Sequence, residues 1–526
     1  MLSSAPSLSP QTPTLKPPRL FLSPPPPEVA AAAAVAAVVA VAAAVVVAVA
    51  AAAVADMSEP GKTLLGLGFR AELAWFIERH QGISFVEILA EDFPSPGQIP
   101  DALKRLHRRG IEIIPHSTSL SLGSTTLPSR QLLKHLDELA RYFDAPFVSD
   151  HIALVRAGGL ESGHLLPVQR SQAMVELLKH NLAEARAGLS VPLVLENIAT
   201  TFDWPVEHNE MGEAQFLRRI LEETDSKLLL DVSNLFANSF NHHFDAGSFL
   251  SQLPLERLEY VHLAGGAFKQ GLYHDTHCHP LREESLKLLS LLAGLCRGAN
   301  LPLKRVMLER DDNFAEDDEL AAELAAIEAA CGGPSEVMPP PIVRPPNRAL
   351  PERAPELLAD TPEVNAGHCR SAQTIEKIEA GHRALLALLL REPQGAGEGA
   401  VPGLPPELSG FDGKLLGQAR QSLIAKRLRT MKRACPYLME IFPREEMLDQ
   451  ALRRFYRDSP SPSAAGPYTD AMHFLVFLQE KSEEFAGLDG YKLTPQAVKQ
   501  ARRHLSPGFV WQRLIQGLLP EGWLKN

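Results

Sequence analysis

Short apolar segments alternate with longer amphipathic ones from about Leu64 to Cys331, and this alternation restricts the fold more than any other feature of the chain. Most of the short segments are continuous apolar runs, which is typical of strands buried on both faces of a parallel sheet. The eight predicted strands are Leu64–Phe69, Phe85–Ala90, Ile111–His116, Phe147–His151, Val191–Glu196, Lys227–Asp231, Leu258–Leu263 and Arg305–Glu309. The segments between them, such as Ser129–Tyr142, Val168–Leu189 and Glu213–Glu223, carry apolar residues at helical spacing.

Eight strand–helix units within about 270 residues have the size of a (β/α)8 barrel. We therefore predict an α/β fold in which a TIM-type barrel spans residues 61–335 and a smaller, mostly α-helical domain follows it. A doubly wound open sheet is the alternative. Such a sheet usually has fewer strands and often a glycine-rich phosphate turn, and Gly66-Leu67-Gly68 is only a fragment of one.

Ionisable residues terminate most of the predicted strands. They are His116, His151, Glu196, Asp231, His262 and Glu309, and the loop after the seventh strand adds Asp275 and His277. In a barrel, the carboxyl ends of all strands meet at one face, where active sites lie. A single histidine at a strand end is more often a hydrogen-bonded structural residue, so the prediction of a site depends on the joint pattern.

Burial of ionisable groups is costly unless they are paired or bound to metal. A mixture of imidazoles and carboxylates suits Fe, Mn and Zn, and the absence of cysteine among the strand ends disfavours a thiolate-rich zinc site. Eight ligands exceed the needs of one octahedral ion. The sequence therefore predicts two or three ions, with a carboxylate bridging between them.

Several neighbouring polar residues have two interpretations. The asparagines Asn197, Asn234 and Asn241 either orient metal ligands or cap the helices that follow. Glu87 and Glu91, near the second strand, either reach the same face and bind substrate or have a solvated or ion-paired role.

An ordered set of motifs gives the chain a resemblance to a known family. The motifs are Pro115-His116-Ser117, Leu120-Ser121-Leu122-Gly123, Ser149-Asp150-His151, Leu165-Leu166-Pro167, Leu195-Glu196-Asn197, Glu213–Leu217, Leu230–Asn234, Asn241–Asp245, His262-Leu263-Ala264-Gly265 and Asp275-Thr276-His277. In this order and spacing, residues 64–315 resemble the multinuclear non-haem iron-dependent oxidases, which include the oxidase of methanobactin biosynthesis. The Ala90-Glu91-Asp92-Phe93 segment departs from the family pattern, where Glu-Asn is more frequent.

The resemblance implies a barrel with two or three irons. The family's ligands would fall on His116, His151, Glu196, Asp231, His262, Asp275, His277 and Glu309. Glu196 would be the bridging carboxylate, and we assign the catalytic centre to Glu196, His151 and Asp231. Members of the family use O2 to oxidise cysteine residues of ribosomally synthesised peptides, often with a partner protein or accessory domain that holds the peptide.

Two other functions fit the strand-end residues alone. Multi-metal barrels with such ligands also include metal-dependent hydrolases and isomerases, for example endonuclease-like and sugar-isomerase-like enzymes. A non-catalytic scaffold is the third interpretation, and the presence of all eight candidate ligands argues against it.

Residues 1–60 are rich in proline and then in alanine and valine. The run Val29–Ala55 contains only Ala and Val and is long enough for a membrane anchor. We favour a low-complexity extension that precedes a start at Met57, because Ala is weakly apolar and no Lys or Arg directly flanks the run. The five cysteines are odd in number and include no C-x-x-C pair, which disfavours a disulfide scaffold and favours a reducing compartment. We therefore predict a cytoplasmic location, and a membrane anchor through residues 29–55 is the alternative.

The last third of the chain is divided by proline-rich segments. We predict a linker region at residues 336–406 that includes a candidate helix, and a helical accessory domain at residues 407–526. The segment Gly413–Tyr437 is basic, although the net charge of the chain is −11 and argues against a general nucleic-acid binder. We interpret the basic segment either as a solvated helix face or as a surface that holds an acidic peptide substrate.

Overall fold

The computed structural model describes residues 63–93, 99–332, 372–390, 403–435, 438–442, 444–458 and 467–481. The described residues all belong to one compact unit, residues 60–526. The predictions for residues 1–60, including the Ala/Val run, lie outside the described residues, as does most of the proline-rich region 336–406. Within the described ranges, no helix combines the length and the apolar character needed to cross a bilayer.

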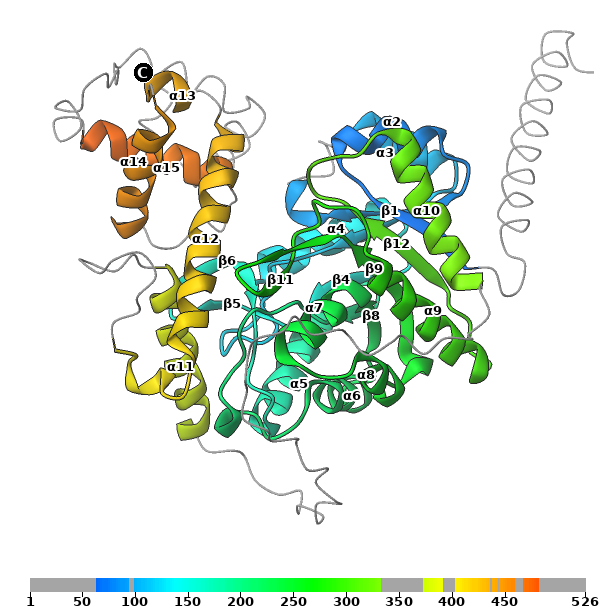
Figure 1. The fold of residues 1–526 in the computed structure, drawn as a ribbon, viewed down its shortest axis with the longest axis horizontal. Helices are drawn as coiled ribbons and strands as arrows, with labels where there is room; N and C mark the ends of the chain where they lie inside the picture. Colours follow the sequence, from blue (N-terminus) through cyan, green and yellow to red (C-terminus); the bar gives the residue numbers. More distant parts are fainter. Residues whose placement is uncertain are drawn as a thin grey trace, which may run out of the picture. The chain divides into compact units, whose positions relative to one another are not determined.

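Eight parallel strands close into a barrel in the spatial order β1-β12-β9-β8-β7-β4-β3-β2 (Figure 1). The strands are β1 (Leu64–Gly68), β2 (Ile83–Leu89), β3 (Glu112–His116), β4 (Val148–His151), β7 (Leu193–Glu196), β8 (Lys227–Asp231), β9 (Leu258–Ala264) and β12 (Arg305–Glu309). Each begins and ends within two residues of its predicted bounds. The predicted TIM-type barrel is therefore confirmed, and the open-sheet alternative is wrong because β1 pairs with both β2 and β12.

Helices follow the strands and cover the outside of the barrel. They are α2 (Ala74–Arg79), α3 (Asp101–Arg108), α4 (Arg130–Tyr142), α5 (Gln172–Ala187), α6 (Glu213–Glu223), α7 (Val232–His242), α8 (Ala246–Gln252), α9 (Glu283–Gly298) and α10 (Asp317–Gly332). Side-chain caps fix several of their starts: Ser171 Oγ accepts from the Met174 amide at 3.2 Å, and Asp245 Oδ1 accepts from the Ser248 amide at 2.7 Å. Such caps each stabilise a helix by roughly 1 kcal/mol.

Two β-hairpins interrupt the strand–helix alternation at the carboxyl ends of the barrel strands. β5 (Leu154–Ala157) pairs with β6 (Leu160–Leu166) after β4, and β10 (Gly266–Lys269) pairs with β11 (Leu272–Asp275) after β9. Both turns use residues with positive φ, Gly158 and Gly159 in the first and Gln270 and Gly271 in the second. The second hairpin ends at Asp275 and so determines where the predicted site loop begins.

An inner apolar layer fills the barrel below its carboxyl face. It consists of Phe85, Ile114, Phe147, Val194, Leu229, Tyr260 and Met307, each at or next to a different strand. Side chains alternate between the two faces of a strand, so the residue two positions later on each strand also points inward. The strand register therefore also determines which residues form the next layer, toward the carboxyl face of the barrel.

The described C-terminal residues are helical, as predicted. The helices are α11 (Ala372–Leu390), α12 (Gly413–Ala434), α13 (Leu438–Ile441), α14 (Glu445–Asp458) and α15 (Pro467–Glu480). Helix α11 packs against β5 and β6, and Leu385 and Leu386 join the barrel's own apolar core. A second apolar cluster begins at Ile424 within α12 and includes α13 to α15. The part of the predicted accessory domain beyond residue 481 lies outside the described residues.

Candidate metal centre

A ring of polar side chains lies directly above the apolar layer. Two residues after each member of that layer come Glu87, His116, Ser149, Glu196, Asp231, His262 and Glu309, all of them buried. His151 stands one inward position further along β4. The strand register alone thus brings five of the eight predicted site residues into one layer and a sixth just above it. Asp275 and His277 reach the ring from the end of β11 and the loop that follows it.

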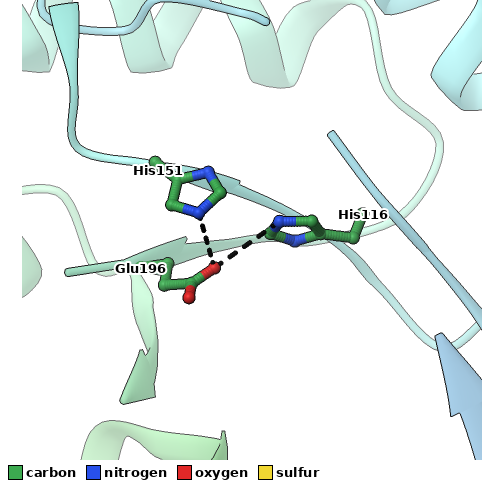
Figure 2. Close-up of side chains that lie close together, drawn as sticks. All are labelled: His116, His151 and Glu196. Atoms are coloured by element: carbon green, nitrogen blue, oxygen red, sulfur yellow. Dashed lines mark ion pairs between the residues drawn. The ribbon is translucent and has the colours of Figure 1, made fainter. Parts of the chain in front are cut away.

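The first group of candidate ligands contains His116, His151 and Glu196. Nε2 of His151 lies 3.1 Å from Oε2 of Glu196, and Nε2 of His116 lies 3.6 Å from the same oxygen. Figure 2 shows both rings directed at this one carboxylate oxygen. The three side chains come from the adjacent strands β4 and β7 and from β3 beside them.

Three further groups continue from the first and share members with one another. They are Glu196 with Asp231 and His262, Asp231 with Asp275 and His277, and His277 with Glu309 and Asp311. Within each group, one ligand atom from every residue lies within 4.8 Å of the others. All eight predicted residues belong to this chain of groups, and three of them, Glu196, Asp231 and His277, belong to two groups each.

The cluster contains many buried polar atoms that lack hydrogen-bond partners among the described residues. They are His151 Nδ1, Glu196 Oε2, Asp231 Oδ2, His262 Nδ1, Asp275 Oδ1 and His277 Nδ1. An unsatisfied buried donor or acceptor costs about 1–3 kcal/mol, so six in one place need an explanation. Metal ions would bind these oxygens and unprotonated nitrogens directly, so the residues present fit a multinuclear centre.

The charges of the cluster are strongly coupled. Burial lowers the pKa of His262, but the charges of Glu87 and Glu196 outweigh burial and raise it well above its ordinary value. Burial raises the pKa of Glu196, but His151 and His262 outweigh it and lower it to about 2. The pKa of Asp231 rises well above its usual range because of burial and then the charge of Asp275. Without a metal, the carboxylates hold protons on the histidines, and bound cations would replace those protons.

His151 differs from the other histidines of the cluster. Burial lowers its pKa to about 4, although the charge of Glu196 opposes this change. The imidazole is therefore neutral at physiological pH, which is the form that binds metal.

Of the two roles considered from the sequence, the asparagine after β7 orients a candidate ligand, and the side-chain cap of α7 comes from Asp231 rather than from an asparagine. Asn197 donates to the Asp231 carbonyl at 3.0 Å and accepts from the Asp231 amide at 2.9 Å, which fixes the position of this candidate ligand. Asp231 itself caps α7, because its Oδ1 accepts from the Asn234 amide at 2.7 Å. Its other oxygen, Oδ2, is left for the cluster. Asn241 joins the loop at Thr200 to β11 through Tyr273.

Glu87 and Glu91 have different environments. Oε1 of Glu91 accepts from the hydroxyl of Ser117 and the amide of Thr118, both at 2.9 Å, and so fixes the loop after β3. Glu87 lies in the buried ring, where Oε2 contacts Tyr260 Oη at 2.7 Å and His262 Nε2 at 3.0 Å. Glu91 therefore has a loop-stabilising role, and Glu87 belongs to the site.

Asp311 was not among the predicted site residues. Oδ2 lies 3.3 Å from His277 Nδ1, while Oδ1 pairs with the partly buried guanidinium of Arg70. The Asp311 amide also donates to the His277 carbonyl at 2.8 Å, which ties the His277 loop to the end of β12. The sequence does carry a signal for Asp311. It lies two residues after Glu309, so the inward-facing side-chain positions of β12 continue to it beyond the end of the strand.

Comparison with known proteins agrees with this geometry. The family model described as "RiPP precursor modification enzyme MbnB/TglH/ChrH" matches residues 64–331. A UPF0276 protein of Streptomyces avermitilis is 44% identical over 269 residues, which cover 50% of this chain and 54% of the relative. This chain therefore spans about half of that relative's length. A UPF0276 protein of Rhizorhabdus wittichii is 33% identical over 274 residues, which cover 51% of this chain and 95% of the relative.

Among solved structures, D-psicose 3-epimerase from Clostridium cellulolyticum H10 is 15% identical to this chain with a TM-score of 0.35, and the match covers 51% of this chain and 98% of the epimerase. The family match covers every strand of the barrel and all eight predicted site residues. The chain therefore belongs to the MbnB/TglH/ChrH family of RiPP precursor modification enzymes.

Proposed function

We propose that this chain is a multinuclear non-haem iron-dependent oxidase that uses O2 to modify cysteine residues of a ribosomally synthesised peptide. The family supports an enzyme that acts on a precursor peptide. The observation that carries the proposal is the continuous chain of four overlapping His/Asp/Glu groups at the carboxyl face of the barrel. Shared carboxylates between neighbouring groups suit two or three adjacent ions.

The residues of the cluster have separate roles in this proposal. The metal ligands are His116, His151, Glu196, Asp231, His262, Asp275, His277 and Glu309. Glu196 would bridge two ions, since it belongs to two groups and its two oxygens face different histidines, His151 and His262. Together with His151 and Asp231 it forms the catalytic centre. Asp311 is a further candidate ligand beside His277.

Bound iron would supply the redox chemistry that passes electrons from a substrate thiolate to O2. The protein's own part is to hold its ligands in place, and bound cations would replace the protons that the histidines carry. The buried apolar layer beneath the ring closes the barrel interior to bulk water on that side of the site. The thiol of the peptide would lose its proton on entry, because thiolates bind metal and thiols do not.

The proposal is tested by oxygen consumption. Anaerobically purified protein, loaded with Fe²⁺ and mixed with a cysteine-containing precursor peptide, should consume O2 and change the mass of the peptide. The Glu196→Ala variant should do neither. Activity with Zn²⁺ or Mn²⁺ on a phosphodiester or a sugar, without O2 uptake, would instead support a hydrolase or isomerase, because the same ligand types accept those metals. A protein that holds metal but turns over no substrate would support the scaffold interpretation.

We further propose that α12 holds part of the peptide substrate. Lys426 Nζ lies 3.3 Å from His164 Nδ1 on β6. Burial lowers the pKa of Lys426, and the charge of Asp311 opposes this change. Arg429 is near enough to Cys278 to oppose the rise in the pKa of that thiol, which burial and Asp312 cause. These two cations therefore lie where an acidic peptide would approach the metal centre.

Two other basic residues of the segment stabilise the helical bundle. Arg427 pairs with Asp470 at 2.7 Å and stacks on the ring of Tyr456, and Lys432 pairs with Glu445 and Asp449. Binding tests should therefore change Lys426 and Arg429 to alanine, with Lys414→Ala on the exposed start of α12 as the control. A fluorescent glutamate-rich peptide with one cysteine should bind more weakly to the double variant alone. Equal binding by all three proteins would contradict the role of α12.

A further inference from the structure

Two members of the buried ring are not among the proposed metal ligands. Glu87 and Ser149 occupy the same layer as His116, Glu196, Asp231, His262 and Glu309, on strands β2 and β4. Glu87 is 3% exposed and Ser149 is fully buried. A buried carboxylate is costly unless it is paired or hydrogen-bonded, so its place in the ring depends on its partners.

Both residues contact the outer nitrogens of ligand histidines. Ser149 Oγ lies 2.9 Å from Nδ1 of His116, and Glu87 Oε2 lies 3.0 Å from Nε2 of His262. The opposite nitrogens face the cluster: Nε2 of His116 is 3.6 Å from Glu196, and Nδ1 of His262 is 3.4 Å from both Glu196 and Glu309. Each histidine thus has one ring nitrogen in contact with Ser149 or Glu87 and the other directed at the candidate metal centre.

Tyr260 joins the two contacts from the layer below. Its hydroxyl lies 2.7 Å from Glu87 Oε2 and 2.6 Å from Ser149 Oγ. The ring of Tyr260 packs within the apolar layer, beside Phe147 at 5.2 Å between centroids, which holds the hydroxyl in place.

The donors and acceptors of this network can be assigned from the carboxylate of Glu87 outward. The carboxylate oxygen of Glu87 only accepts, so Tyr260 donates to it, and Tyr260 has no second proton. Ser149 must then donate to Tyr260 and accept from His116 Nδ1–H. Glu87 also accepts from His262 Nε2–H. This arrangement leaves Nε2 of His116 and Nδ1 of His262 unprotonated, which are the two nitrogens that face Glu196.

We infer that Glu87, Tyr260 and Ser149 form a positioning network that selects the metal-binding tautomers of His116 and His262 and fixes the orientation of both rings. The inference rests on the proposed metal centre and adds three residues that are not ligands. Hydrogen bonds of this kind to ligand histidines commonly strengthen metal binding by 10- to 100-fold. Because one carboxylate serves two histidines from strands β3 and β9, its loss should affect both ligand positions together.

The test compares metal affinity in matched variants. Zn²⁺ affinity, measured by competition with a chromophoric chelator, should fall about 10- to 100-fold in Glu87→Gln. It should fall less in Tyr260→Phe, which keeps the ring and the carboxylate. Glu112→Gln is the control, because Glu112 lies at the opposite end of β3 and pairs with Arg305 at 2.9 Å. Its Zn²⁺ affinity should equal that of the wild type.

A second measurement separates positioning from general loss of structure. In the Zn²⁺-loaded wild type, ¹⁵N shifts of the ring nitrogens should show a protonated Nδ1 for His116 and a protonated Nε2 for His262. The circular-dichroism spectrum of metal-free Glu87→Gln should match that of the wild type, because glutamine keeps the length and shape of the glutamate side chain.

The outcomes decide between the inference and the proposed function. Unchanged Zn²⁺ affinity in Glu87→Gln, or the opposite tautomers, would overturn this inference and leave the metal centre standing. Loss of one whole ion per chain in Glu87→Gln would also overturn it, because Glu87 would then be a ligand. A wild-type protein that binds neither Zn²⁺ nor Fe²⁺ would overturn both.

Discussion

Gly265 allows the loop that carries His277 to pass close to the end of β9. A Cβ atom at this position would lie 1.7 Å from the carbonyl oxygen of His279 and 2.5 Å from that of Pro280. Carbon atoms in ordinary contact are about 3.5–4.0 Å apart, so a Gly265→Ala variant must displace the backbone of this loop by about 2 Å. The loop has little freedom to adjust, because the Asp311 amide holds the His277 carbonyl and His277 itself has a φ of 54°.

The displacement should separate His277 from Asp275 and Asp231. Metal–ligand distances tolerate changes of only about 0.2 Å. The ion proposed for the group of Asp231, Asp275 and His277 should therefore be lost or bound more than about 100-fold more weakly. The group formed by His116, His151 and Glu196 lies on other strands and should keep its metal. We therefore expect fewer ions per Gly265→Ala chain than per wild-type chain, measured by elemental analysis after dialysis.

Gly298→Ala is a matched control, because a Cβ at Gly298 would meet nothing within 4 Å. This variant should bind the wild-type amount of metal and should be as stable or up to about 1 kcal/mol more stable. A Gly265→Ala protein that is folded and keeps the full wild-type complement of metal would refute the argument from the close approach of the loop.

Three further predictions concern the C-terminal helices. His382 on α11 is buried with a pKa lowered to about 3 by burial, so the folded chain rejects a proton that the unfolded chain binds below pH 6.5. The free energy of unfolding should therefore fall as the pH drops from 6.5 toward 3, by roughly 2 kcal/mol at pH 5. Chemical denaturation should show that His382→Gln lacks this part of the pH dependence. Leu385→Ala should cost about 2–5 kcal/mol, and calorimetry should show the loss in the barrel transition because Leu385 belongs to the barrel core. Arg427→Ala should leave Asp470 buried and unpaired and cost about 3–5 kcal/mol, and hydrogen exchange should rise in α15 while the barrel strands stay protected.

The barrel could be predicted because its strands are buried on both faces and therefore form apolar runs that end in polar residues. Lys227–Asp231 and Arg305–Glu309 have the bounds that the sequence predicts. The two hairpins were missed because they lie in the loops, where the prediction assigned no structure. The Gly158-Gly159 pair between Leu154 and Leu166 was a usable hairpin signal, since both glycines have the positive φ that such a turn needs.

The candidate site could be predicted in part. The strand ends and the family motifs identified eight residues that lie together, and their role as ligands stays a prediction. Glu87 was left with two interpretations and Ser149 was not considered, although each follows a large apolar residue by two positions, as Glu196 follows Val194. Counting inward positions on every strand, rather than only the last polar residue, would have identified both. The partners of Arg427 and Lys432 depend on how separate helices pack, which no local pattern determines.

The central claim is tested most directly by the metal content of the chain. We would purify the wild type and the Glu196→Ala variant without oxygen and measure iron, zinc and manganese per chain by elemental analysis. The account predicts two to three irons in the wild type and a clear loss in the variant, because Glu196 belongs to two of the four ligand groups. Equal metal content in the two proteins, or no metal in the wild type, would contradict it.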